Sequence, residues 1–200
     1  MEENKLKKMR TIILTITILV ASFSVINAQK KATAGIKGGY NLSSVSFDGT
    51  SETEKLHGFH IGFYGESYLT NFLSIQPEIL YSQQGYKIID NGSTYTQELD
   101  YINIPLMFKL YPVKSLFFEA GPQIGFSISH KETFDTGFVL YNTSEEFEPR
   151  NFDWGLNFGA GFKSDSGVSL GVRHHLGQSD IYDRDKPKNR VWHIYIGFDF

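Results

Sequence analysis

An all-β fold is predicted for this chain of 200 residues, and more narrowly an eight-stranded antiparallel β-barrel that crosses a membrane. Three observations lead to this prediction. The chain contains 17 Phe, 11 Tyr and 19 Gly, a composition that favours strands and tight turns. Eight segments alternate apolar and polar residues over roughly ten positions, the length of a tilted membrane-crossing strand. The connections between these segments are alternately long and short.

The first 28 residues have the layout of a cleaved secretory signal peptide. Basic residues precede an apolar run at 12–26, and Ala28 suits the position before the cut. Several Thr and Ser residues leave this run short of the ~20 apolar residues that a spanning helix needs. We therefore expect a signal peptide at 1–28, export, and a barrel domain at 29–200.

The first four predicted strands lie at 34–43, 57–68, 72–86 and 102–110. Each has apolar residues at every second position, which places them on one face of an extended strand. These residues, which we expect to face lipid, are Ile36, Tyr40, Leu42, Phe59, Ile61, Phe63, Leu73, Ile75, Ile79, Tyr81, Ile102, Ile104, Leu106, Phe108 and Leu110.

The last four predicted strands lie at 116–128, 152–163, 168–173 and 192–200. The segment 152–163 has the clearest alternation of apolar residues with polar residues and glycines. The residues expected to face lipid here are Leu116, Phe118, Ile124, Phe126, Ile128, Phe152, Trp154, Leu156, Phe158, Ala160, Phe162, Val168, Leu170, Val172, Trp192, Ile194, Ile196, Phe198 and Phe200. Aromatic girdles are expected near strand ends, at Phe72, Tyr81, Tyr111, Phe152 and Trp192.

The connections separate a membrane barrel from a soluble sandwich or barrel, which would also alternate. Long connections are predicted at 44–56, 87–97, 129–151 and 176–190, and short ones at 69–71, 112–114 and 164–166. This order is typical of outer-membrane barrels, with short periplasmic turns and long extracellular loops. The even number of strands places both ends of the barrel domain on the periplasmic side.

The polar faces of the predicted strands carry isolated charges at mid-strand. In a soluble barrel these charges would face water, whereas in a membrane barrel they face the lumen and are expected to pair. The expected charge network, with a structural role, consists of Lys37, Glu66, Glu78, Lys109, Glu119, Asp153 and Arg173. Because side chains largely fill an eight-stranded barrel, we expect a plugged interior and not a pore.

Five blocks carry a resemblance to a known family: 35–43 (GIKGGYNLS), 76–85 (QPEILYSQQG), 104–112 (IPLMFKLYP), 119–125 (EAGPQIG) and 159–161 (GAG). They resemble the outer-membrane β-barrel domain family, often called PorT-like or porin-family, that is abundant in Bacteroidetes. The resemblance covers nearly all of the mature chain. It implies a barrel architecture, and for one branch of the family a role in type IX protein secretion.

Catalysis is not expected from the inner-face histidines. His60, His175 and His193 are predicted to face the lumen, but no spacing ties them to Ser74 or Glu78 as a nucleophile and its base, and no hydrolase motif is present. Hydrogen bonding inside the lumen is the simpler role for these residues. We therefore predict no catalytic residue and no enzyme.

Metal, cofactor and nucleic-acid sites are also not expected. His174 and His175 are adjacent and must point to opposite faces of a strand. The acidic segment 180–185 lacks the ligand spacing and the glycine of an EF-hand loop. The glycine pairs and clusters do not precede a helix, as a phosphate site requires, and the net charge of −3 offers no basic face for nucleic acid.

The expected partners are therefore outer-membrane lipid, the outer-membrane insertion machinery, and an extracellular or secretion partner of unknown identity. Phe200 ends the alternation of the last strand and resembles the assembly signal that the insertion machinery recognises. For function, a structural or interaction role through the extracellular loops comes first. The alternatives are a PorT-like accessory of secretion or small-solute transport, and more distantly a lipid-modifying enzyme.

Overall fold

The computed structural model describes residues 32–47, 51–90, 93–135, 140–143, 150–181 and 187–200. The signal peptide expected at 1–28 lies outside the described residues. No helix in the described ranges is long and apolar enough to cross a membrane. The strands are β1 (Ala32–Phe47), β2 (Ser51–Glu52), β3 (Glu54–Tyr68), β4 (Leu73–Asp90), β5 (Ser93–Val113), β6 (Leu116–Asp135), β7 (Leu140–Thr143), β8 (Phe152–Lys163), β9 (Val168–Gly177) and β10 (Lys188–Asp199).

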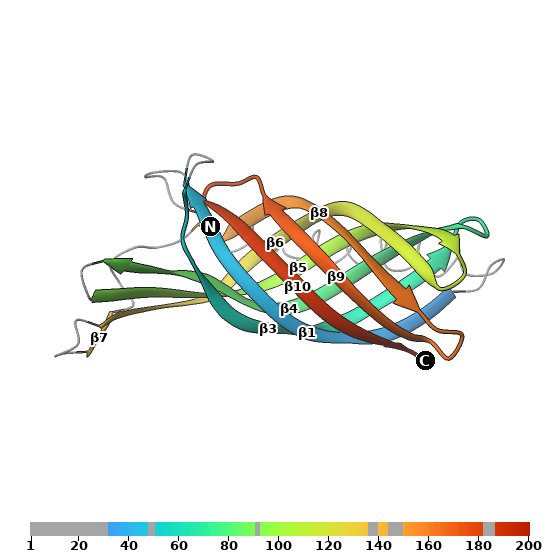
Figure 1. Cartoon of the computed structure of the whole chain (residues 1–200), viewed down its shortest axis with the longest axis horizontal. Helices are drawn as coiled ribbons and strands as arrows, with labels where there is room; N and C mark the ends of the chain where they lie inside the picture. The colour runs from blue at the N-terminus through green and yellow to red at the C-terminus, as the bar shows by residue number, and fades with distance from the viewer. Residues whose placement is uncertain (1–31, 48–50, 91–92, 136–139, 144–149, 182–186) are drawn as a thin grey trace, which may run out of the picture. The chain divides into compact units, whose positions relative to one another are not determined.

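Eight of these strands close into an antiparallel ring in the order β1, β3, β4, β5, β6, β8, β9, β10 (Figure 1). The ring closes through β1 and β10, which pair from Gly35 with Asp199 to Ser46 with Lys188. The short strands β2 and β7 pair with β1 and β6 outside the ring. The predicted eight-stranded antiparallel barrel is confirmed, and closure leaves the ring without a free edge.

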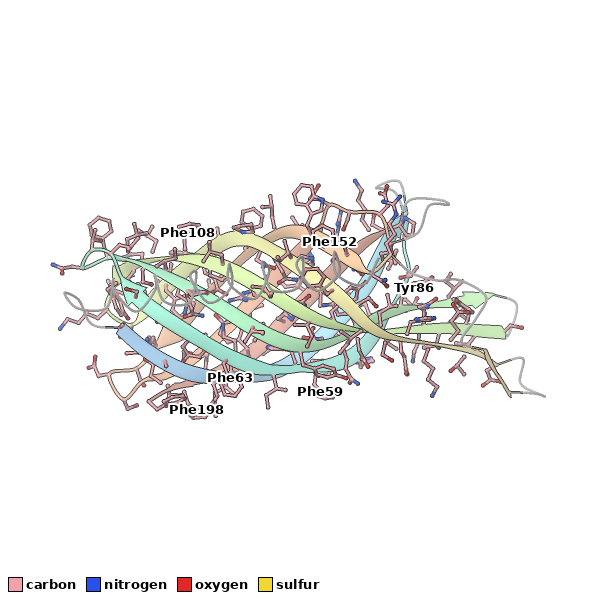
Figure 2. All side chains as sticks on the ribbon, turned by 180° about the vertical axis from the view of Figure 1, so that it is seen from behind. Phe59, Phe63, Tyr86, Phe108, Phe152 and Phe198 are labelled. Carbon is pink, nitrogen blue, oxygen red and sulfur yellow. The ribbon has the colours of Figure 1, made fainter. Side chains whose placement is uncertain are left out.

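The outer surface of the ring is apolar, as the alternation predicts. Phe63 and Phe162 are 62% and 63% exposed, and large apolar side chains are exposed on all eight ring strands. Figure 2 shows Phe59, Phe63, Phe108, Phe152 and Phe198 projecting from the outside of the barrel. A soluble protein rarely exposes so continuous an apolar surface, whereas a hydrocarbon layer requires it.

Tyr111 corrects one detail of the predicted girdles. It is buried, and its Oη donates a hydrogen bond to Oε1 of Glu66 at 2.6 Å. Its neighbour Leu110 is exposed. Because successive residues of a strand point to opposite faces, an outward Leu110 requires an inward Tyr111. By contrast, Phe72, just before β4, and Phe152, the first residue of β8, are exposed at strand ends, as expected. Trp192 is exposed but lies four residues inside β10, and Tyr81 is half-buried in the middle of β4.

Large inward side chains lie across glycines of neighbouring strands. A Cβ added to Gly171 would come 2.4 Å from the ring of Tyr195, and one added to Gly161 would come 2.5 Å from Phe117. The same relation holds between Gly35 and Tyr64. The inward glycines therefore provide the room that lets aromatic rings fill a narrow barrel.

The connections predicted at 44–56, 87–97 and 129–151 differ from the prediction, because much of each is strand. Pairing of β4 with β5 continues to Asp90 opposite Ser93, and pairing of β5 with β6 continues to Thr94 opposite Asp135. β7 adds to the far side of β6. We call residues 86–90, 93–100, 129–135 and 140–143 the loop-end sheet. Figure 1 shows these strands continuing well past the ring.

Irregular residues mark the place where the loop-end sheet leaves the ring. Asp100 pairs with Ser129 and Tyr101 with Ser127, so Ile128 is an extra residue on β6. Gly85 has φ +138°, a conformation that L side chains rarely adopt, and a Cβ there would come 1.9 Å from the carbonyl oxygen of Gln97. Bulges and such glycines bend a strand. They allow β4, β5 and β6 to leave the curvature of the barrel without losing their pairing.

Candidate functional site

The centre of the barrel holds a four-residue charge cluster. Nζ of Lys37 on β1 lies 2.7 Å from Oε1 of Glu78 on β4. Arg173 on β9 donates to both oxygens of Glu78 at 2.8 and 2.9 Å. It also donates to both oxygens of Glu119 on β6, at 2.8 and 2.9 Å. One guanidinium thus makes two bidentate contacts, the strongest arrangement available to an arginine and carboxylates.

The register of three strands explains how Arg173 reaches Glu119. Glu119 pairs with Gly159 on β8, and Gly159 pairs in turn with Arg173. A Cβ on Gly159 would lie 2.8 Å from Oε1 of Glu119. Because Gly159 has no side chain, the arginine can cross the intervening strand to meet the carboxylate.

Neutral donors and a ring complete the central cluster. Tyr195 on β10 donates to Glu119 at 3.0 Å, and Gln76 donates to Glu78 at 2.6 Å. Nζ of Lys37 lies 4.1 Å from the centre of the Tyr195 ring. The cluster contains two cations and two carboxylates, all buried. Its charges balance, which is the condition under which burying them is tolerable.

A second group of charges lies nearer the short turns. Glu66 accepts hydrogen bonds from Ser74, Tyr111 and Lys163, each at 2.6 Å. Lys163 also lies 2.7 Å from Asp199, to which Tyr64 donates at 2.5 Å. Lys163 and Asp199 are missing from the predicted network, although the alternation places both on inner faces.

Lys109 lies beside the central cluster, because it pairs with Glu119 across β5 and β6, whereas Asp153 lies nearer the loops. Nζ of Lys109 lies 4.2 Å from the centre of the Phe117 ring. Asp153 accepts from Asn189 at 3.1 Å and from Ser179, and lies 3.5 Å from Nε2 of His175. The structure therefore brings together four of the seven residues of the expected network, Lys37, Glu78, Glu119 and Arg173. It places Lys109 next to Glu119, and Glu66 and Asp153 at other levels of the lumen.

The lumen histidines bind amide side chains. Nδ1 of His60 and Nδ1 of His193 each lie 2.7 Å from Oδ1 of Asn41. Nδ1 of His175 lies 3.0 Å from Oδ1 of Asn157. Asn41 and Asn157 were not among the predicted site residues, and their inward positions in the alternation are the signal that points to them.

His174 faces outward, and its ring stacks on Trp192 with centres 4.2 Å apart. Its neighbour His175 is buried in the lumen. The two side chains therefore lie on opposite faces of β9. Within the described ranges, no three His, Asp or Glu side chains are placed to hold a metal ion.

Apolar residues occupy the interior near both ends of the barrel. At the loop end Val45, Tyr86, Leu99, Tyr101 and Ile181 form one buried cluster. Toward the turns, Tyr111, Phe117 and Tyr195 form another, with Tyr68 packed against it. Ile181 is held by backbone hydrogen bonds to Pro187 and Arg150. The interior is thus occupied by an apolar cluster at the loop end, by the charge cluster at the centre, and toward the turns by aromatic rings together with the Glu66 group.

Comparisons with known proteins agree with this architecture. A family model described as outer membrane protein beta-barrel domain matches residues 27–183. The chain is similar to Ail, the attachment invasion locus protein of Yersinia pestis, with a TM-score of 0.52 and 15% identity over 85% of this chain and 99% of that one. It is also similar to Neisserial surface protein A, with a TM-score of 0.50 and 14% identity over 85% and 98% of the two chains. No curated protein sequence matches at a significant level. At these identities the solved structures establish the fold alone.

Proposed function

The chain belongs to the outer-membrane β-barrel domain family, and from this premise we propose that it is a closed, non-conducting barrel that presents the loop-end sheet as a binding surface outside the cell. The observation that carries the proposal is the continuation of β4, β5 and β6 beyond the ring as paired strands. A paired sheet is preorganised, so a partner binds it without first ordering a loop. The binding role is a non-enzymatic one.

The exposed side chains of the loop-end sheet suit a protein partner. Ile89 is 62% exposed, and the same face of the sheet carries Lys87 and Glu98. Strand edges and faces with exposed apolar residues bordered by charges are common recognition surfaces. The similarity to Ail concerns the fold and does not support a binding role. That role is supported by the exposed residues of the loop-end sheet.

Small-solute transport is disfavoured by the contents of the lumen. A conducting path would have to cross the apolar cluster around Ile181 and then the bidentate contacts of Arg173. We predict that the refolded barrel gives no steady ion current in a planar lipid bilayer. A reproducible current that scales with voltage would contradict the closed lumen and select the transport alternative.

A second prediction concerns the exposure of the loop-end sheet at the cell surface. Because the chain contains no cysteine, a single introduced cysteine can be labelled specifically. A membrane-impermeant maleimide should label the Ile89→Cys variant on intact cells. It should label Asp165→Cys, in the exposed turn between β8 and β9, only after the outer membrane is permeabilised. Phe108→Cys, facing hydrocarbon, is the unreactive control. The opposite labelling pattern for Ile89→Cys and Asp165→Cys would show that the barrel has the opposite orientation and that the loop-end sheet does not lie outside the cell.

The binding role itself is tested at the same position. A photoactivatable maleimide on Ile89→Cys should form adducts with a second macromolecule on intact cells, and the unsubstituted barrel, which has no cysteine, should form none under the same treatment. Labelled Ile89→Cys that forms no such adducts would argue against a binding surface.

The second candidate is a PorT-like accessory of protein secretion, favoured by the sequence blocks that resemble that family. It differs in its expected phenotype. Loss of secretion of exported proteins after deletion of the gene would select this role, whereas normal secretion would leave the surface-binding role.

A further inference from the structure

An apolar groove of about 610 Å³ crosses the outer wall of the barrel over β10, β1, β3 and β4. Its side walls include Ile61, Phe63, Ile79, Ile196 and Phe198. Figure 2 shows Phe63 and Phe198 projecting close to each other from the outer surface. The volume falls in the range of ligand sites, roughly 300–1,000 Å³.

Gly38 lies in the groove, in the middle of β1. The alternation points its missing side chain outward, between the exposed Ile36 and Tyr40. Its φ is not positive, and a Cβ built there would find its nearest atoms at 3.6 Å, the carbonyl oxygen of His60, and 4.0 Å, Cγ1 of Ile61. Neither backbone conformation nor crowding therefore requires a glycine at this position.

This freedom sets Gly38 apart from most glycines of the barrel. Every other glycine in the described ranges except Gly65 would bring a Cβ within 3.0 Å of another atom. Those glycines are needed by the packing of the barrel. A mid-strand glycine allows a ligand to approach the backbone closely. Gly38 differs from Gly65 in that the open space above it belongs to the groove.

The polarity around the groove indicates which ligand fits. Its lining presents apolar side chains, since the ammonium of Lys37 points into the lumen and binds Glu78. At the end nearer the loops the groove reaches Tyr81, whose Oη accepts a hydrogen bond from Gln83 at 3.3 Å. Tyr40, on the same wall, hydrogen-bonds His57. An apolar trough with polar groups at its loop end matches a molecule with an acyl chain and a polar head.

We propose that this groove binds one acyl chain of a membrane lipid, with Gly38 as its floor and with the lipid's polar region beside Tyr81 and Tyr40. The groove lies in the lipid-facing band, where acyl chains are the solvent. A second copy of the chain would need a projecting ridge to fill so local a depression, whereas a single chain fills it without any complementary surface. The inference is independent of the binding role of the loop-end sheet, which lies beyond the ring.

The proposal is tested with one substitution that fills the groove and a matched substitution outside it. Gly38→Leu places a side chain on the groove floor, and Gly65→Leu places one at the other outward glycine with room for a Cβ, which is not part of the groove lining. Each barrel is reconstituted into phosphatidylcholine vesicles containing an acyl-chain spin-labelled phosphatidylcholine. All of these barrels restrict the lipids that touch their outer wall, and a chain held in the groove should exchange with the bulk lipid more slowly than those. We expect the unsubstituted barrel and Gly65→Leu to show this slowly exchanging fraction and Gly38→Leu to lose it.

Two further measurements make the result decisive. Heat-modifiable migration checks that each barrel is folded. If Gly38→Leu does not fold, Gly38→Ala replaces it in the test, and its smaller side chain should remove part of the groove-bound lipid signal. Equal slowly exchanging fractions in all folded barrels would overturn the proposal. Cross-linking that shows dimers of the unsubstituted barrel but not of Gly38→Leu would overturn it as well, because the occupant would then be a second copy of the chain.

Discussion

Replacing Arg173 by methionine is expected to destabilise the barrel by about 3–5 kcal/mol, the usual consequence of removing one partner from a buried ion pair. The substitution removes four hydrogen bonds to Glu78 and Glu119. Glu78 keeps Lys37 at 2.7 Å, whereas Glu119 loses its bidentate cation and keeps a hydrogen bond from the neutral donor Tyr195. Urea unfolding in lipid vesicles, followed by the shift between folded and unfolded gel mobility, measures the effect.

Two comparisons separate this effect from a general response to losing an arginine. Arg190→Met removes a half-buried arginine that donates to the backbone oxygens of Gly177 and Asn189, and should cost less than about 1.5 kcal/mol. Arg173→Met combined with Glu119→Leu should recover part of the lost stability, because it also removes the buried carboxylate that has lost its bidentate partner. Glu119→Leu alone should be destabilising, since it leaves an excess positive charge. Equal effects of Arg173→Met and Arg190→Met would show that the central charges are hydrated in the lumen.

The alternation of side chains was enough to predict which residues face lipid and which face the lumen. A strand in a closed ring has two faces only, so a period of two decides each position once the apolar face is known to be outside. The exposed Phe158 and the buried Asn157, adjacent on β8, follow directly from that rule. The error at Tyr111 came from weighing its position near a strand end above the same rule.

Contacts inside the lumen were not predictable to the same extent. Alternation places Glu66, Asp153 and Arg173 on inner faces but does not give their heights, which depend on the stagger between neighbouring strands. That stagger puts Arg173 level with Gly159 and Glu119. It puts Glu66 level with Lys163, a residue that the predicted network did not include. The dipeptide Asn91-Gly92, favoured in two-residue hairpins, is the sequence signal that could have revealed the pairing of β4 with β5 in the loop-end sheet.

Replacement of Phe200 by alanine is expected to reduce sharply the amount of barrel inserted into the outer membrane of cells, while the same variant still folds into lipid or detergent in vitro. Phe200 continues the outward series of Trp192, Ile194, Ile196 and Phe198, and its backbone N–H donates to the carbonyl oxygen of Ala34 on β1 at 2.8 Å. It is 79% exposed. A side chain with so few contacts inside the protein contributes little to packing, which is why we propose that the insertion machinery reads it.

Anchoring at the interface is the competing explanation for Phe200, and it predicts a different pattern. Loss of one lipid-buried ring should lower stability by no more than about 1.5–3 kcal/mol and should do so equally in cells and in vitro. Phe198→Ala is the matched control, because Phe198 lies on the same face and is 44% exposed. Quantifying the heat-modifiable form in outer-membrane fractions distinguishes the two explanations. If Phe200 is a signal, only Phe200→Ala loses insertion in cells. Similar small losses for both variants would leave Phe200 as an anchor, because an interfacial ring acts through lipid contact wherever it lies on that face.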